Sequence, residues 1–403
     1  MAKPKLALIP AAQGTKLFSV LPSDGVGDFT FTRGSVATRI NAQGLIENVA
    51  SGQSRLNYPM IDGVQKGCPH HILEPQRSNV CGYSDNLTQW SLTNGTLSSN
   101  SVISPDGTLN ADKVVFNNVA LDLKRTVTVV AGTTYTFSFY IKLESGTGLQ
   151  GRFYDNSNSA NIEYYDYSNQ VLGTDWTRVT RQVTTPSGCT QMQVWLLASS
   201  SSLVTASFWG AQLEVGSYET SYIPTSTTAV VTRSAETASG AGNSTTFNDS
   251  EGVLMAEISA LDNDGTYRMI SLSDGTVNNS TNIQYSGVSN QIRTRIENGG
   301  VAQADIVANV ISQTLFNKIA VLYKLNQFEL WSNGFKVGED TTGTPPSGIN
   351  KLSFDNGGGL NDFYGKTKQV QYFDSALADT QLEQLTSWTS FTDMANGQLY
   401  TIE

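Results

Sequence analysis

Two adjacent histidines, His70 and His71, are the only imidazoles in the 403-residue chain. A Ser-His-Asp triad needs a histidine base held between a serine and a carboxylate, so one of these two would have to serve. No G-x-S-x-G nucleophile motif accompanies them. The pattern therefore favours a polar loop at the start of a domain over hydrolase chemistry.

The same segment offers thiolate and imidazole ligands for zinc. Cys68, His70, His71 and Cys81 form the pattern C-x-H-H-x9-C, which is not a spacing typical of zinc sites. Buried thiols and surface imidazoles are the favoured interpretation. Cys189 brings the cysteines to three, and an odd number does not indicate a disulfide framework.

Glycosidase chemistry needs two carboxylates on either side of the scissile bond, roughly 5 to 10 Å apart. Sandwich glycanases of the concanavalin type carry them on one strand as E-x-D-x-x-E, and this run is absent from the sequence. Glu251 and Glu257 lie six residues apart at the start of a predicted strand, without the intervening Asp. We therefore expect that the protein is not an enzyme.

Acidic turns supply the hard oxygen ligands that calcium prefers. Asp262 and Asp264 lie in the run DNDG, and further acidic loops surround Asp274 and Asp362. Asp, Asn and Gly are also the residues of ordinary Asx turns, which is the favoured interpretation. We expect no cofactor, and any calcium at Asp262 and Asp264 would be structural.

Residues 152–170, RFYDNSNSANIEYYDYSNQ, combine aromatic rings with amides, carboxylates and hydroxyls. Aromatic faces pack on the apolar face of a pyranose, while amides and carboxylates bind its hydroxyls. The alternative, which we favour, is a strand whose tyrosines pack inward at every second position. The candidate glycan-binding residues are Tyr154, Tyr164, Tyr165, Tyr167 and, on another predicted strand, Trp195.

Charge and hydropathy argue against two classes of partner. The formal net charge is −10 with a pI near 4.8, and no Lys/Arg cluster offers the basic face of a nucleic-acid-binding protein. No stretch approaches the roughly 20 apolar residues of a membrane helix, so we expect no membrane insertion. The N-terminus lacks the apolar run of a signal peptide, so we expect synthesis in the cytoplasm.

Period-two alternation is the dominant structural signal. In YTFSFYIKL, the residues Tyr135, Phe137, Phe139 and Ile141 share one face, as expected of a half-buried strand. The segments WTRVTRQVTTP, QMQVWLLAS and WGAQLEVGS repeat the pattern. Only 15% of the residues are charged, and 36 are glycines, which favours strands and turns over helices. The predicted fold class is all-β, with two antiparallel β-sandwich (jelly-roll) domains in tandem.

The chain divides into five predicted segments. They are a small N-terminal β region at 1–66, a first sandwich at 67–228, a linker rich in Ser, Thr, Ala and Gly at 229–250, a second sandwich at 251–390 and a C-terminal tail at 391–403. The N-terminal region has little apolar mass, so we expect it to lean on another part of the assembly.

Two local motifs stand out in the second sandwich. Asn333-Gly334 separates two strand-like runs and accepts positive φ at both turn positions, which predicts a two-residue hairpin. The run SALADTQLEQLTSW places leucines near one face and predicts a single short helix at 376–387.

Phrases of the first two regions resemble bacteriophage fibre, appendage and other tail- or head-associated proteins. These phrases are FSVLPSDGVGDFTFTRGSVATRINAQGLIENV, ILEPQRSN, SPDGTLNADK and FWGAQLEVGSYETSYIPT. The resemblance implies that the first sandwich is a jelly roll like a carbohydrate-binding module. The second sandwich resembles the concanavalin A or laminin G type, on the residues FNKIAVLYK, LWSNGFKVG and GKTKQVQYFDSALADTQLEQL. The resemblance covers nearly the whole chain and carries over no catalytic residue.

The resemblance implies a virion protein, and three functions stay open. The first is a receptor-binding fibre or appendage that recognises a host cell-surface polysaccharide. The second is a purely architectural decoration or connector that binds only other virion structural proteins. The third, and least favoured, is a polysaccharide depolymerase.

Self-association is expected from the N-terminal region. In a monomer, its large apolar residues would form an exposed patch beside open strand edges. We therefore expect a homo-oligomer, with a homotrimer as the first choice by analogy with phage fibres, and contact with the particle through residues 1–66. The apolar residues are Leu17, Phe18, Phe29, Phe31, Leu45 and Ile46.

Overall fold

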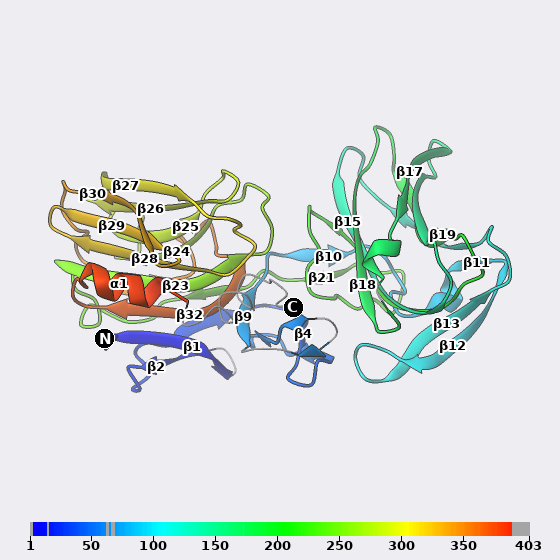
Figure 1. Cartoon of the computed structure of the whole chain (residues 1–403), viewed down its shortest axis with the longest axis horizontal. Coiled ribbons are helices and arrows are strands. Elements are labelled where there is room, and N and C mark those ends of the chain that lie inside the picture. The colour runs from blue at the N-terminus through cyan, green and yellow to red at the C-terminus, as the bar shows by residue number, and fades with distance from the viewer. Residues whose placement is uncertain (1–2, 14–15, 62–63, 66–68, 172, 389–403) are drawn as a thin grey trace.

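The computed structural model describes residues 3–388 apart from 14–15, 62–63, 66–68 and 172 (Figure 1). The all-β prediction is confirmed: antiparallel sheets form two sandwiches, drawn at opposite ends of the molecule in Figure 1. The predicted C-terminal tail, 391–403, lies outside the described residues. Within them, no helix is long and apolar enough to cross a membrane.

The middle sandwich consists of two five-stranded sheets. The outer sheet has the order β11 (Ser91–Thr93), β14 (Asp122–Thr128), β19 (Gln191–Ser199), β16 (Gln150–Asp155) and β17 (Ala160–Asp166). The inner sheet has the order β12 (Gly95–Ile103), β13 (Leu109–Phe116), β20 (Thr205–Val215), β15 (Thr134–Ser145) and β18 (Thr177–Thr184). Two 3-10 turns, η1 (Leu87–Gln89) and η2 (Ser168–Gln170), lie in the loops of this sandwich.

Aromatic rings join the two sheets of the middle sandwich. Phe139 of β15 meets Tyr167 edge to face at 5.6 Å, and Phe137 meets Phe153 of β16 at 6.0 Å. All four side chains are buried. Burying each large apolar side chain contributes about 2 kcal/mol before entropy is subtracted, so the period-two pattern alone accounts for the pairing of these sheets.

The third region forms the other sandwich. Its smaller sheet has the order β27 (Val301–Asn309), β26 (Gln291–Asn298), β25 (Ser280–Tyr285), β24 (Arg268–Ser273) and β31 (Lys351–Ser353). The facing sheet includes β32 (Gly365–Phe373), β23 (Glu251–Ala260), β28 (Asn317–Lys324), β29 (Gln327–Ser332) and β30 (Phe335–Asp340). The hairpin prediction is confirmed, because Asn333 and Gly334 between β29 and β30 have φ of 50° and 92°.

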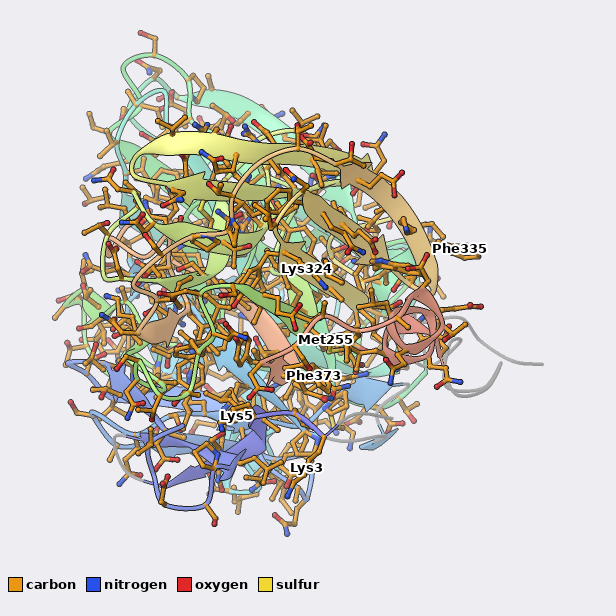
Figure 2. All side chains as sticks on the ribbon, turned by 90° about the vertical axis from the view of Figure 1, so that its left-hand side faces the viewer. Lys3, Lys5, Met255, Lys324, Phe335 and Phe373 are labelled. Carbon is orange, nitrogen blue, oxygen red and sulfur yellow. The ribbon has the colours of Figure 1, made fainter. Side chains whose placement is uncertain are left out.

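One α-helix, α1 (Asp379–Thr386), follows the last strand, and the prediction of a helix there is confirmed with a later start. Its Leu382 and Leu385 pack with Trp331, Met255 and Phe373 on the outward face of the larger sheet. Met255 and Phe373 are labelled in Figure 2, which also shows Phe335 projecting from the edge strand β30.

The N-terminal region extends the larger sheet of the third region. Strand β1 pairs with β32, and the sheet continues through β2 and β3 to β22, while β9 pairs with β32 and with β6. The result is an 11-stranded sheet built from both ends of the chain. The added strands are β1 (Leu6–Gln13), β2 (Lys16–Leu21), β3 (Phe29–Thr32), β6 (Leu56–Asn57), β9 (His70–Leu73) and β22 (Thr237–Ser239).

Because of this pairing, the prediction of an exposed apolar patch in the N-terminal region is wrong for most of its residues. Leu17, Phe29 and Phe31 are buried in the same core as the third region, and Ile46 is buried against the middle sandwich. Leu45 is exposed, and the Phe18 side chain lies outside the described part. The chain's own β32 supplies the strand edge and the core that a sibling copy was expected to supply, so these residues give no reason for a trimer.

The predicted linker is ordered for part of its length. Strand β21 (Val231–Arg233) pairs with β10 (Arg77–Asn79), and β22 pairs with β3. Two further strand pairs lie in the N-terminal region: β4 (Ala37–Ile40) with β5 (Ile46–Val49), and β7 (Met60–Ile61) with β8 (Val64–Gln65). The segment between the sandwiches is thus held at two places by strand pairing.

Candidate functional site

A row of cationic and aromatic side chains crosses the outer sheet of the middle sandwich. The strand register places Lys124 of β14 opposite Trp195 of β19, Trp195 opposite Arg152 of β16, and Arg152 opposite Tyr164 of β17. Period two adds Tyr154 to the same face as Arg152. We call these five residues the cation-aromatic cluster.

Arg152 is the centre of this cluster. Its guanidinium carbon lies 4.5 Å from the ring centroid of Tyr154, 4.7 Å from that of Tyr164 and 4.9 Å from that of Trp195. The Lys124 ammonium lies 4.3 Å from the Trp195 ring. Cations over aromatic faces are attracted by the ring quadrupole, so Trp195 holds two positive charges in place on this face.

Hydrogen-bonding capacity remains available on the cluster. The Arg152 Nε donates to Asn161 Oδ1 at 2.8 Å, and its other guanidinium nitrogens have no hydrogen-bond partner within the described residues. The Trp195 Nε1 is buried and likewise lacks a partner there. Tyr164 is 51% exposed, whereas Trp195 is only 6% exposed beneath its two cations. The face therefore offers the guanidinium donors of Arg152 and the ring of Tyr164, which is more than half exposed.

Amide groups continue the same face along the next row. Gln193 of β19 lies opposite Tyr154 and opposite Thr126 of β14. The Gln193 Nε2 donates to Asn156 Oδ1 at 3.0 Å. Amides pair with hydroxyl groups in both directions, since each carries donors and an acceptor. Rings, cations and amides in adjacent rows suit a polyhydroxylated ligand.

Two of the predicted glycan-binding tyrosines lie on the opposite side of this sheet. Tyr165 stacks on Phe153 at 5.0 Å, and its hydroxyl donates to the Trp195 carbonyl at 3.1 Å. The Tyr167 hydroxyl donates to the Leu196 carbonyl at 2.7 Å. Both are buried in the core, which raises the pKa of each hydroxyl. Burial removes Tyr165 and Tyr167 from the candidate set and bears out the inward-packing alternative for them alone.

Sequence reasoning missed the two cations of the cluster. Arg152 had a local signal, because it alternates with Tyr154 on one strand and therefore shares its face. Lys124 had none, because it lies on a strand far from Trp195 in the sequence and reaches it only through the register of β14 with β19.

The prediction of a polar loop with surface imidazoles is wrong for the paired histidines. His70 and His71 begin β9 and are both buried, because β9 is enclosed between β6 and β32. Cys68 lies outside the described residues, and Cys81 and Cys189 are buried free thiols. No group of three or more metal-ligating side chains occurs within the part of the chain that the structure describes.

The acidic candidates are engaged by other side chains. Asp264 forms an ion pair with Arg268 at 2.9 Å and accepts from the Thr266 amide in an Asx turn. The Asp262 carboxylate accepts from Ser217 Oγ at 2.7 Å. These contacts give both carboxylates partners within the chain.

The two glutamates considered as a catalytic pair also have partners. Glu251 lies 3.2 Å from the Lys324 ammonium, and Glu257 lies 3.3 Å from that of Lys368. Each carboxylate is therefore held by a lysine on a neighbouring strand.

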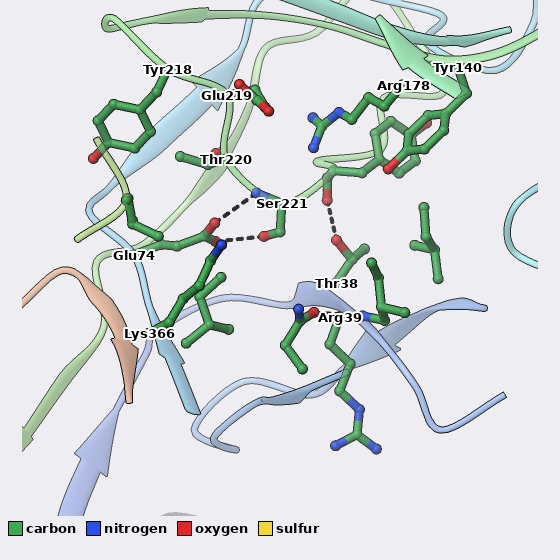
Figure 3. Close-up of a pocket in the computed structure, with 16 residues that line it drawn as sticks. Thr38, Arg39, Glu74, Tyr140, Arg178, Tyr218, Glu219, Thr220, Ser221 and Lys366 are labelled. Atoms are coloured by element: carbon green, nitrogen blue, oxygen red, sulfur yellow. Dashed lines mark hydrogen bonds between the residues drawn. The ribbon is translucent and has the colours of Figure 1, made fainter. Parts of the chain in front are cut away.

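A cavity of about 200 Å³ lies where the N-terminal region and both sandwiches meet (Figure 3). Thr38 and Ile72 come from the N-terminal region, Tyr140 and Arg178 from the inner sheet, and Lys366 from β32. The loop 218–222, which follows β20, closes one side.

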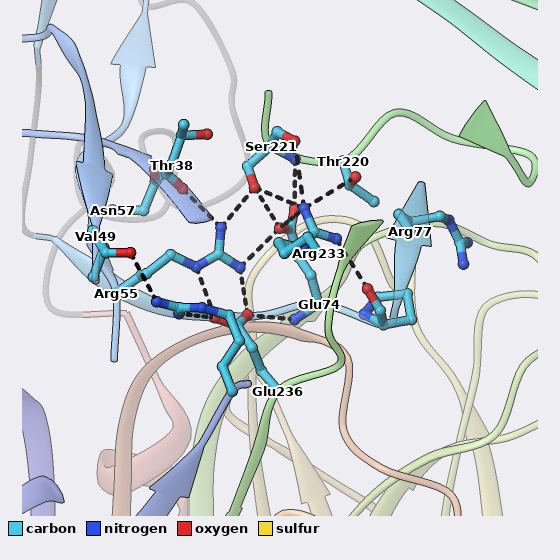
Figure 4. Close-up of polar contacts among 12 residues, drawn as sticks. Thr38, Val49, Arg55, Asn57, Glu74, Arg77, Thr220, Ser221, Arg233 and Glu236 are labelled. Carbon is cyan, nitrogen blue, oxygen red and sulfur yellow. Dashed lines mark hydrogen bonds and ion pairs between the residues drawn. The ribbon is translucent and has the colours of Figure 1, made fainter. Parts of the chain in front are cut away.

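A network of buried ion pairs lies next to this cavity and shares Glu74 with its lining (Figure 4). Glu236 receives Arg33 Nη1 at 2.7 Å and Arg55 Nε at 2.8 Å. Glu74 receives Arg55 Nη2 at 2.8 Å and Arg233 Nη1 at 2.7 Å. All five side chains are at most 2% exposed. The network ties the N-terminal region to the segment between the sandwiches.

Three guanidinium groups share two carboxylates in this network, so the carboxylates are the more strongly compensated groups. Burial alone would raise the pKa of Glu74, but Arg233 and Arg55 hold it well below its usual range. Burial alone would lower the pKa of Arg55, and Glu236 and Glu74 reverse that effect. Such a cluster is costly to break, because removing one partner leaves an uncompensated buried charge.

Comparison with known proteins finds a family match for the middle sandwich. Residues 81–201 match the protein-family model of the CBM4/9 type that is described as a carbohydrate binding domain. A search of the curated proteins finds no match to the chain.

Solved structures with partial similarity include carbohydrate-binding modules and a phage protein. The Ruminococcus gnavus IT-sialidase CBM40 bound to alpha2,3 sialyllactose is 16% identical with a TM-score of 0.32, and the match covers 37% of this chain and 88% of that one. A CBM4 structure is 15% identical with a TM-score of 0.25, over 32% of this chain and 78% of that one. The enzymatically active domain of bacteriophage CBA120 tailspike protein 4 is 16% identical with a TM-score of 0.29, over 34% of this chain and 21% of that one.

Identities and TM-scores this low add nothing to the assignment, which rests on the family model. The cation-aromatic cluster lies on strands within residues 81–201. The chain thus carries, in its middle sandwich, a carbohydrate-binding domain of the CBM4/9 type.

Proposed function

We propose that this protein is a virion surface protein, a fibre or appendage of a bacteriophage, which binds a host cell-surface polysaccharide through the outer sheet of its middle sandwich. The observation that carries the binding site is the position of Arg152 among three aromatic rings on the outward face of a carbohydrate-binding domain. The virion role is supported by the sequence phrases that resemble phage appendage proteins.

The side chains of this face have different roles in binding. The half-exposed ring of Tyr164 packs on the apolar face of a pyranose. Arg152 and Lys124 donate hydrogen bonds to hydroxyl or carboxylate oxygens of the sugar. Trp195 lies below them and positions the cations, which is a different task from the stacking role expected for it.

The proposal is one of recognition without cleavage. Separate contacts support this, because a neighbouring side chain holds each candidate carboxylate. These carboxylates are Glu251, Glu257, Asp262 and Asp264. Purified protein should therefore leave host polysaccharide at its original chain length. Release of reducing ends that is abolished by one Asp or Glu substitution would show a depolymerase instead.

Replacing Arg152 by glutamine should weaken polysaccharide binding by at least about tenfold, because it removes the charge-assisted hydrogen bonds of the guanidinium. An array of bacterial surface polysaccharides, probed with the full chain, measures this. Lys113→Gln is the control, since it removes an exposed charge of the inner sheet that is paired with Glu144. If the unaltered protein binds no polysaccharide on the array, the architectural alternative is favoured. Equal binding by R152Q would remove the cluster from the site.

A further inference from the structure

The junction cavity presents two cations that the protein leaves without a counter-ion at contact distance. Arg178 reaches it from β18 of the middle sandwich, and Lys366 reaches it from β32 of the third region. The Arg178 Nη2 donates to Ser138 Oγ at 2.9 Å, while its Nε is buried with no partner within the described residues. The Lys366 ammonium has no ion pair or hydrogen bond there either. Both side chains are only partly exposed.

The nearest carboxylates form no ion pair with these cations within 4.0 Å. At Arg178, burial is outweighed by Tyr140 and by the more distant carboxylates Glu219, Glu214 and Glu74, which raise the pKa of the guanidinium. Glu74 lines the cavity, but its oxygens are taken by Arg55, by Arg233 and by the amide and hydroxyl of Ser221, the latter at 2.8 and 2.6 Å. Glu219 is exposed at the rim and forms no ion pair within 4.0 Å with any described residue. Figure 3 shows Glu219 and Arg178 on the same side of the cavity, with Lys366 pointing toward Ser221.

The electrostatic balance at Lys366 agrees with this geometry. Burial lowers the pKa of its ammonium, and the more distant Glu219 and Glu74 only partly offset the effect. An anion that entered the cavity would supply the missing compensation, and a partly desolvated site strengthens such a charge pair.

The remaining walls are apolar and aromatic. Ile40, Ile72 and Leu261 line the cavity, together with the ring of Tyr140, which lies 5.5 Å below the Arg178 guanidinium. This combination suits a ligand with a carboxylate at one end and a ring with an apolar face at the other. A small inorganic anion would leave these walls unfilled.

We propose that the junction cavity is a second glycan subsite, which binds the carboxylate of an acidic sugar such as a hexuronic acid between Arg178 and Lys366. The inference rests on the proposed function in one respect, namely that the protein meets acidic polysaccharide. It is otherwise independent of the cation-aromatic cluster, because the cavity lies on the inner sheet, at the opposite face of the middle sandwich. Since Arg178 and Lys366 belong to different sandwiches, the subsite exists only in the folded full chain.

The test is a titration of the full chain with free glucuronate, glucose and acetate, followed by isothermal calorimetry or ligand-detected NMR. Glucuronate should bind with millimolar affinity, and glucose and acetate should bind at least about tenfold more weakly, since each lacks half of the recognised chemistry. Arg178→Gln and Lys366→Gln should each weaken glucuronate binding at least about tenfold. Glu219→Gln should tighten it by roughly two- to fivefold, because a repelling charge at the rim is removed.

Matched controls lie on the same strands. Arg181→Gln on β18 and Lys368→Gln on β32 remove the same charges, but those side chains are paired with Glu163 and Glu257. They should bind glucuronate as the unaltered protein does. Misfolding can only weaken binding, so the tighter glucuronate binding expected for E219Q cannot be caused by misfolding.

Three outcomes would overturn the inference: no glucuronate binding by the unaltered protein, equal loss in the control variants, or acetate binding as tightly as glucuronate. The variant R152Q separates this inference from the proposed function. If R152Q no longer binds polysaccharide but still binds glucuronate, the result supports both proposed sites. If glucuronate binding depends on Arg152 and not on Arg178, the result supports the outer-sheet site and contradicts the junction subsite.

Discussion

Glu236→Gln is expected to lower the free energy of unfolding by about 3–5 kcal/mol, the cost of leaving buried charge without its partner. Glu236 accepts hydrogen bonds from Arg33, from Arg55 and from the backbone amide of Glu74, and its carboxylate is fully buried. The neutral amide cannot compensate the two guanidinium groups, and it turns donors toward them. Urea denaturation followed by fluorescence measures the change.

The control for this variant is Glu339→Gln. Glu339 pairs with Lys336 at 3.3 Å at an exposed position, so its loss should change the free energy of unfolding by no more than about 1 kcal/mol. A loss for E236Q as small as that of E339Q would mean that the network contributes little. It would also remove the reason for regarding the segment between the sandwiches as fixed.

Acidification from pH 7 to about pH 2 is expected to destabilise the protein in two steps. Burial, followed by the charges of Lys366, Lys368 and His71, lowers the pKa of His70 well below 6.5. The folded state therefore keeps His70 neutral while the unfolded chain takes up a proton below about pH 6.5. Stability is lost as pH falls through that value, by up to about 1.4 kcal/mol per pH unit for one group.

Glu74 adds the second step. Its pKa is lowered in the folded state, so its stabilising effect is present above the unfolded value of 4.5 and is lost as pH falls below it. Urea midpoints at intervals between pH 7 and about pH 2 measure both steps. His70→Gln should flatten the profile between pH 6.5 and 5 and leave the lower step in place. A profile for H70Q that matches the unaltered protein over that range would contradict the assignment to His70.

Short-range pattern was sufficient to predict the sheets. Phe137 and Phe139 alternate with polar residues and are buried, and Asn333-Gly334 forms the expected turn. Each of these signals lies within one strand or one hairpin, where the side-chain period and the allowed φ decide the structure. The same period could have separated Tyr164 from Tyr165, because adjacent residues in a strand face opposite sides.

Long-range pairing was beyond the sequence pattern. Nothing near Leu6 or Tyr372 indicates that β1 pairs with β32, because strand pairing across a whole chain has no local signature. The ion network is a similar case. Arg55 and Glu236 are far apart in the sequence and form a buried ion pair, yet each one taken alone resembles an ordinary surface charge. Arg233 and Glu236 within a run of small residues were the only sign that the predicted linker packs against something.

The candidate site combines both cases. Tyr154, Tyr164 and Trp195 were found from composition, since rings among amides are typical of sugar-binding faces. Their common centre, Arg152, depends on register across three strands, and Lys124 depends on a fourth. The sequence thus indicated the chemistry of the face, and only the sheet order shows which residues form it.

A crystal structure of the full chain with an oligosaccharide from a polysaccharide that binds on the array tests the central claim most directly. We predict a sugar ring packed on Tyr164, with the Arg152 guanidinium within hydrogen-bond distance of its oxygens, on the outer sheet of the middle sandwich. An oligosaccharide bound only to the sandwich of the third region, with the cation-aromatic cluster unoccupied, would contradict it.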